Sequence, residues 1–138
     1  MSERLSLHMT NSPAELGAVM RAAEGFLQRH GQAERTVYLV TLVMEEVLTN
    51  IIKYAYEDED EHVIGIELTL GEQDVLITTE DDGREFDPLS VPPPRISGDI
   101  EDLQPGGLGI HLIRNLSHSV EYVRTDRLNR FAVRVLHG

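Results

Sequence analysis

The sequence predicts an α/β domain built as a two-layer sandwich, in which a mixed, mainly antiparallel sheet is covered on one face by helices. Two stretches of helical periodicity come first, and apolar–polar alternation then recurs in segments that pair through short turns. Such segments form antiparallel hairpins, and the apolar stripes of the helices need a sheet face to cover. The 138 residues and a hydrophobic fraction of 41% suit one domain over 1–138.

A strand and a helix should open the chain. Alternation over residues 5–9 predicts the strand. Ser12 as a cap and Pro13 at the first helical position predict the helix start, and Gly31 predicts its end. Between them, apolar residues recur at spacings of three and four, which is the pattern of a helix with one buried face.

A second and longer helix is predicted over residues 34–56. It carries one continuous apolar stripe, and a second apolar strip lies beside it at Leu39 and Val43. A helix that is so apolar should be largely covered by the rest of the domain. The acidic run at 57–61 ends the pattern and indicates a solvated loop.

The remaining chain predicts two hairpins separated by a long connection. The expected elements are strands at 63–70 and 75–80, a helix at 108–116, and strands at 120–123 and 131–136 joined by a turn at 126–129. Periodicity is absent from 88–105, where consecutive prolines exclude both a helix and a central strand. A connection of this length in a compact domain is usually functional or disordered.

Charge and composition exclude several classes of function. The formal net charge of -12 and the lack of a basic stripe make nucleic acid a poor partner. Without cysteine, the chain has no disulfide, thiolate nucleophile or cysteine-ligated metal. The amino terminus lacks the pattern of a signal peptide, and no segment has the roughly 20 apolar residues that span a bilayer. We therefore expect a cytoplasmic protein with no membrane partner.

The first candidate site is the pair Glu46 and Asn50, which lies on one side of the second helix, one turn apart. A carboxylate and an amide beside the apolar strip need a reason to be there. An Asn oxygen can ligate Mg²⁺, and a Glu can accept a proton from a hydroxyl or a water. The alternative is that both are ordinary surface residues.

The second candidate is the pair Asp81 and Gly83, at the end of an expected strand. A carboxylate there can accept a hydrogen bond from an exocyclic amine, such as that of adenine, and the glycine can turn the backbone sharply. The alternative is a simple turn that uses Asp-Gly chemistry.

The third candidate is a glycine-rich loop that opens onto the short helix. It consists of Gly106, Gly107, Leu108 and Gly109. Backbone N–H groups without side chains can approach phosphate oxygens closely, and the helix dipole adds partial positive charge. The spacing matches neither a Walker loop nor a dinucleotide fingerprint. The alternative is a flexible hinge followed by a helix cap.

Taken in order, the three candidates resemble the sequence boxes of the GHKL ATPase superfamily, which includes gyrase, Hsp90, histidine kinases and MutL. Residues 46–50 resemble its N box, 81–83 its G1 box and 106–109 its G2 box. The resemblance covers roughly residues 10–136 and implies the Bergerat ATP-binding fold.

Within that superfamily, the small size, the segment 50–56 and the ending 86–88 are similar to the anti-sigma-factor serine/threonine kinases of the RsbW and SpoIIAB type. This similarity implies a role for each candidate. The implied roles are Glu46 as general base, Asn50 as Mg²⁺ ligand, Asp81 as acceptor for the adenine amino group, Gly83 as the point where the chain passes under the base, Gly106, Gly107, Leu108 and Gly109 as the phosphate cradle, and residues 88–105 as an ATP lid.

Some positions depart from the family pattern. Lys53 stands where many relatives carry His, and Glu85 and Phe86 replace the second glycine of the wider superfamily. In the last strand, Ala132 is assigned the position where relatives often carry Thr near the adenine. We therefore expect that contact to be missing.

The resemblance implies a protein serine kinase that uses ATP and Mg²⁺. It also implies an anti-anti-sigma (STAS-domain) protein as substrate and a homodimer that holds a sigma factor. Two alternatives stay open at this point. One is a non-catalytic switch that sequesters a regulatory protein and in which nucleotide only biases partner binding. The other is an ATPase that uses water, although its larger relatives need an added transducer domain.

Overall fold

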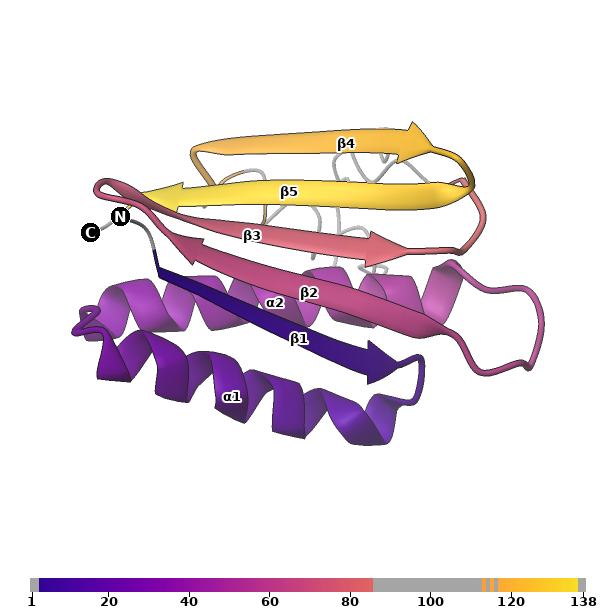
Figure 1. Cartoon of the computed structure of the whole chain (residues 1–138), viewed down its shortest axis with the longest axis horizontal. Coiled ribbons are helices and arrows are strands. Elements are labelled where there is room, and N and C mark those ends of the chain that lie inside the picture. Colours follow the sequence, from indigo (N-terminus) through magenta and orange to yellow (C-terminus); the bar gives the residue numbers. More distant parts are fainter. Residues whose placement is uncertain (1–2, 86–112, 114, 116, 137–138) are drawn as a thin grey trace, which may run out of the picture.

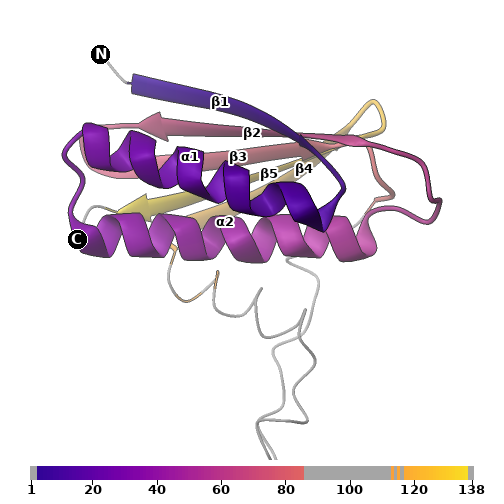
Figure 2. The same cartoon turned by 90° about the horizontal axis from the view of Figure 1, so that it is seen from below.

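The computed structural model describes residues 3–85, 113, 115 and 117–136. Its elements are β1 (Glu3–Thr10), η1 (Pro13–Glu15), α1 (Leu16–Arg29), α2 (Glu34–Tyr54), β2 (Val63–Leu70), β3 (Asp74–Asp81), β4 (Ser119–Thr125) and β5 (Leu128–Leu136). The described strands form a five-stranded sheet in the order β1-β2-β3-β5-β4, and each neighbouring pair is antiparallel. Both helices lie on one side of this sheet (Figure 1 and Figure 2). The predicted two-layer α/β sandwich is therefore confirmed.

The core lies between the two helices and the sheet face that they cover. Strand residues point alternately toward and away from the helices, so that in β3 the residues Val75, Ile77 and Thr79 are buried and their neighbours are more exposed. In α2, Val43 is 1% exposed. The apolar strip of Leu39 and Val43, which we expected to lie beside the main apolar stripe of this helix, thus belongs partly to the core.

The first helical turn differs from the prediction. Residues Pro13–Glu15 form a 3₁₀ turn, and α1 begins only at Leu16. Ser12 has the extended backbone of a cap, but its side chain makes no capping hydrogen bond. Its carbonyl instead accepts a hydrogen bond from the N–H of Glu15 at 3.1 Å. Such tight turns are frequent at helix ends because they satisfy terminal backbone groups locally.

The second helix ends two residues earlier than the 56 that we expected. It stops at Tyr54 with Ala55 as its C-cap. The carbonyl of Ala55 accepts a hydrogen bond from the backbone N–H of Arg84 at 2.8 Å. The chain that follows β3 therefore crosses the end of α2 and satisfies one of its terminal carbonyls.

The last hairpin turn is shorter than the predicted turn at 126–129. Only Asp126 and Arg127 lie between the strands, with φ of 51° and 69°. Two consecutive left-handed residues match the twist of the flanking strands, which is the geometry of a two-residue hairpin turn. Asn129 is consequently a strand residue, and it pairs with Asp81 of β3 in the register.

Candidate functional site

Asn50 and Glu46 occupy one side of α2 as predicted, but they differ in exposure. Asn50 is 8% exposed, whereas Glu46 is only partly buried. Within the part of the chain that the structure describes, the Asn50 amide makes no side-chain hydrogen bond. The amide is not among the fully buried, unpaired side-chain atoms of the described residues, so its oxygen is accessible to a ligand or a cation. This observation fits the predicted role in Mg²⁺ binding.

The pKa of the Glu46 carboxyl is raised above its ordinary value. Burial is the largest cause, and the neighbouring negative charge of Glu45 adds to it, while the positive charge of Lys53 acts in the opposite direction. A carboxylate whose pKa is raised holds a proton more readily. Glu46 is therefore suited to accept a proton from a hydroxyl group at its side of the helix.

Asp81 ends β3 and is 5% exposed. Its Oδ1 accepts hydrogen bonds from the backbone N–H of Gly83 and from Nδ2 of Asn129, each at 2.9 Å. Burial raises the pKa of Asp81, and the hydrogen bonds from Asn129 and Gly83 counteract part of that rise. The site thus contains a buried carboxylate of fixed orientation at a strand end, as the adenine-binding role requires.

Gly83 lies directly against the end of α2. A Cβ atom at this position would stand 2.5 Å from the carbonyl oxygen of Ala55 and 2.6 Å from its Cβ. Arg84 follows and binds the same helix end, because its N–H donates to Ala55 and its Nε donates to the carbonyl of Tyr54 at 2.7 Å. The glycine therefore allows the strand end that carries Asp81 to pack on the helix that carries the first candidate pair.

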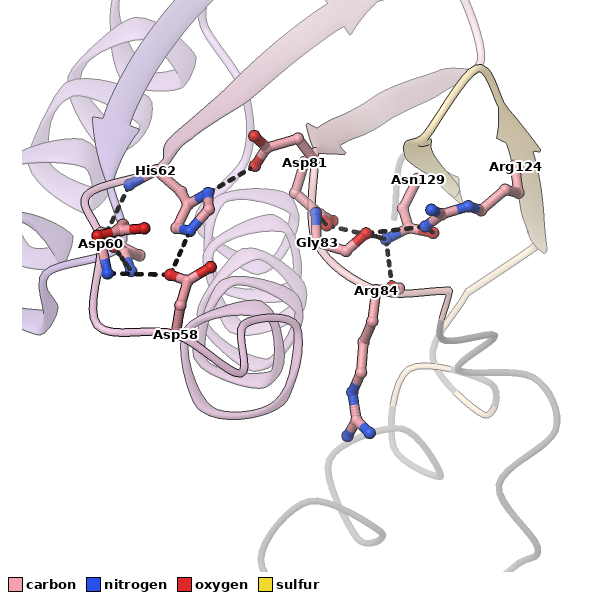
Figure 3. A network of polar contacts seen from close by, with 10 residues as sticks. Asp58, Asp60, His62, Asp81, Gly83, Arg84, Arg124 and Asn129 are labelled. Atoms are coloured by element: carbon pink, nitrogen blue, oxygen red, sulfur yellow. Dashed lines mark hydrogen bonds and ion pairs between the residues drawn. The ribbon is translucent and has the colours of Figure 1, made fainter.

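Sequence reasoning missed a polar network behind Asp81. Asn129 of β5 donates through Nδ2 to Asp81 and to the carbonyl of Arg84 at 2.8 Å, and a longer contact of 3.4 Å reaches the carbonyl of Gly83. Arg124 of β4 donates to the carbonyl of Gly83 at 2.8 Å. Figure 3 shows both side chains reaching from the last hairpin to the turn after β3. The network joins three strands at one end of the sheet.

A histidine links the acidic loop after α2 to the same end of the sheet. The Nε2 of His62 lies 2.7 Å from Asp58 (Figure 3), and its Nδ1 lies 3.1 Å from Asp82. The ring also stacks on Tyr56, with 4.1 Å between the ring centroids. The hydrogen bond to Asp58 is the largest of the causes that raise the pKa of His62. The acidic run 57–61, which the sequence predicts to be a solvated loop, is thus anchored beside the site through Asp58.

Replacing His62 by Gln should destabilise the protein more at about pH 6 than at about pH 9. Because the pKa of His62 is raised in the folded protein, its stabilising effect is fully present below the unfolded value of 6.5 and is lost as the pH rises through the folded value. Denaturant unfolding at both pH values measures this difference. The exposed His8 supplies the control, and an equal penalty at both pH values would contradict the anchoring role.

The structure contradicts the position assigned to Ala132, and it does not describe the glycine loop or the lid. Ala132 pairs with Thr78 on the sheet face that points away from the helices, whereas the buried Asp81 points toward them. Ala132 therefore does not stand where a side chain could meet a base at Asp81. The glycine loop 106–109 and the lid 88–105 lie outside the described residues, so their predicted roles remain predictions.

The acidic and histidine side chains of the described residues limit how the site can bind a metal ion. Among the described residues, no group of three or more His, Cys, Asp or Glu side chains could hold a metal ion. A Mg²⁺ site at Asn50 would therefore take its other ligands from water and phosphate, as this cation commonly does. No described helix has the length and apolar character to cross a membrane.

A comparison with protein families identifies one match. The model described as "Histidine kinase-like ATPase domain" matches residues 9–135. Among curated proteins, the serine/threonine-protein kinase BtrW of Bordetella bronchiseptica is 29% identical over 99 residues, which are 72% of this chain and 70% of that protein. Serine-protein kinase RsbW of Halalkalibacterium halodurans is 30% identical over 110 residues, 77% of this chain and 67% of that protein.

Solved structures are similar in fold. The RsbU and RsbW domains of a Mycobacterium tuberculosis protein superpose with a TM-score of 0.65 at 12% identity. The match covers 97% of this chain and 32% of that one, so the chain spans about a third of that solved chain. The histidine kinase domain of a blue-light activated histidine kinase from Erythrobacter litoralis gives a TM-score of 0.54 at 20% identity, over 90% of this chain and 60% of that one. Both likenesses concern the fold alone.

Proposed function

This chain belongs to the histidine kinase-like ATPase domain family, and from that premise we propose that it binds Mg-ATP and phosphorylates a serine of a partner protein. The observation that carries the proposal is the packing of Gly83 and Arg84 on the end of α2. This packing joins the strand end of Asp81 to the helix of Glu46 and Asn50. The names of the relatives, which are serine or serine/threonine kinases, support the same reaction.

Each residue of the site has one task in this proposal. Asp81 accepts a hydrogen bond from the adenine amino group, and the Asn50 oxygen ligates Mg²⁺, which when bound neutralises charge on the phosphates. Glu46 takes the proton of the serine hydroxyl as the serine oxygen bonds to the γ-phosphorus. The bond from that phosphorus to the β–γ bridging oxygen breaks, and ADP leaves. Gly106, Gly107, Leu108 and Gly109 cradle the phosphates, and residues 88–105 close over them.

We extend the proposal to partners from the resemblance to the RsbW and SpoIIAB type. The substrate is then an anti-anti-sigma (STAS-domain) protein, and a homodimer of this chain holds a sigma factor in the cytoplasm. The products distinguish this account from its two alternatives. Phosphate release without any partner would favour an ATPase. Equal partner binding with and without ATP, together with no turnover, would favour a non-catalytic switch.

Replacing Asn50 by Ala should abolish the dependence of ATP binding on Mg²⁺. The expected loss in Mg-ATP affinity is at least the roughly 10–100-fold that removal of an outer-shell partner costs a metal site. Binding of ATP in the presence of a chelator should change little. Calorimetric titration with and without Mg²⁺ measures both quantities, and Thr49→Ala on the preceding position of α2 is the control. Unchanged Mg-ATP affinity in Asn50→Ala would contradict the assignment.

A further inference from the structure

The hydrogen bonds of Asp81 are distributed unequally over its two oxygens. Oδ1 accepts from both Gly83 and Asn129, at 2.9 Å in each case. Among the described residues, Oδ2 has no hydrogen-bond partner. An ionised carboxylate accepts hydrogen bonds at both oxygens. Oδ2 is therefore the oxygen of Asp81 that is available to accept a hydrogen bond from a ligand.

The orientation of the Asn129 amide is set by its surroundings. Its Nδ2 faces acceptors only, namely Asp81 and the carbonyls of Gly83 and Arg84. Its Oδ1 accepts from the hydroxyl of Tyr122 at 2.6 Å and from Nη1 of Arg124 at 3.0 Å, and a guanidinium can only donate. The flipped amide would place its NH₂ against the Arg124 guanidinium and its oxygen against the oxygens of Asp81, Gly83 and Arg84. The hydrogen-bond partners therefore fix one orientation of the amide.

Arg124 supplies a positive charge within this network. It donates to Asn129 and to the carbonyl of Gly83, so its positive charge acts on Asp81 through the residues between them. The other groups that face Asp81 work against ionisation or carry no charge. They are the adjacent carboxylate of Asp82 and the phenol of Tyr56. The hydrogen bonds from Asn129 and Gly83 and the positive charge of Arg124 therefore lower the pKa of Asp81 against the effect of burial.

We propose that Asn129, held by Tyr122 and Arg124, is the positioning residue that turns Asp81 so that Oδ2 faces the amino group of an adenine. The inference rests on the proposed ATP-binding function, and it assigns base selectivity to the last hairpin. Adenine offers an amino group to this oxygen, whereas guanine offers a carbonyl oxygen at the same place and is rejected. Asn129 touches no nucleotide in this account and acts only through Asp81.

Asn129→Ala should lower the affinity for Mg-ATP by about tenfold, the effect of one hydrogen bond to a charged group, and leave the weaker affinity for Mg-GTP unchanged. In an Asp81→Asn background the same change should have little further effect, because the two residues act as a unit. Calorimetric titrations of the full chain with both nucleotides measure this cycle. A variant that merely damaged the fold would lose affinity for both nucleotides and in both backgrounds.

A second measurement needs no nucleotide. The pKa of Asp81, followed through its carboxyl carbon by NMR, should rise in Asn129→Ala and in Arg124→Met. Arg134→Met is the matched control, because Arg134 lies on the outer sheet face and pairs with Asp74 at 3.2 Å. ATP binding requires the ionised carboxylate. As the pH is lowered, binding should therefore begin to weaken at a higher pH in the first two variants than in the wild type.

The two measurements separate the possible failures. If the wild type binds no ATP but the pKa of Asp81 shifts as expected, the nucleotide function fails and the positioning of the carboxylate stands. If ATP binds through Asp81 and neither the affinity nor the pKa responds to Asn129→Ala and Arg124→Met, the positioning role is wrong while the proposed function stands. A parallel loss of ATP and GTP affinity would also overturn it.

Discussion

Glu46→Gln should lower the rate of phosphoryl transfer to a partner serine by about 10²–10⁴-fold, the usual contribution of a positioned general base. The affinity for Mg-ATP should stay within about twofold, because the change keeps the size of the side chain and Glu46 is assigned no nucleotide contact. Since the pKa of Glu46 is raised by burial, the wild-type rate should fall as the pH falls through that pKa. The variant should lack this part of the pH profile.

The neighbouring Glu45 is the control for this experiment, because it is exposed and carries the same charge one position earlier on α2. Glu45→Gln should transfer phosphate at nearly the wild-type rate. Single-turnover kinetics with saturating ATP measure the chemical step apart from binding. Equal rates in Glu46→Gln and in the wild type would remove Glu46 from the mechanism.

Gly83→Ala should destabilise the fold by about 1–3 kcal/mol, as overpacking of a close contact usually does, and it should also abolish ATP binding. The added methyl group would meet the backbone of Ala55 at 2.5 Å. A backbone carbonyl at a helix end does not yield as a flexible side chain does. The turn must then move away from α2, and Asp81 moves with it.

Gly65→Ala tests whether this effect is specific to the close contact. A Cβ atom at Gly65 would lie no closer than 4.0 Å to its neighbours, which is an ordinary contact. We therefore expect a change in stability within about 0.5 kcal/mol and unchanged nucleotide binding. Denaturant unfolding measures the stability of both variants, and calorimetric titration measures their affinity for ATP. Similar behaviour of the two alanine variants would contradict the role assigned to Gly83.

The sheet and helices could be predicted because their signals are local. The strand expected at 63–70 is β2 (Val63–Leu70) without any shift. Its alternation is regular and a turn signal follows it. The sequence predicts the end of α2 two residues too late, because this end depends on a contact with Arg84, which is distant in the sequence. No periodicity within the helix contains that information.

The same distinction explains what was missed at the site. The turn predicted at 126–129 includes Asn129. The alternation that runs back from Val135 through Val133 and Phe131 places it on the buried face of β5, and this was the available signal. The bond between Asn129 and Asp81 spans 48 residues. It became visible only when the register of β3 and β5 was known.

The most direct test of the account is the product of one reaction. The protein is incubated with Mg-ATP and a cognate STAS-domain protein, and mass spectrometry then locates any phosphate on the partner. We expect phosphoserine on the partner, formed together with an equal amount of ADP, and at most a trace of it with Glu46→Gln in the same time. ATP binding without any phosphoserine, or ADP formed with free phosphate alone, would contradict it.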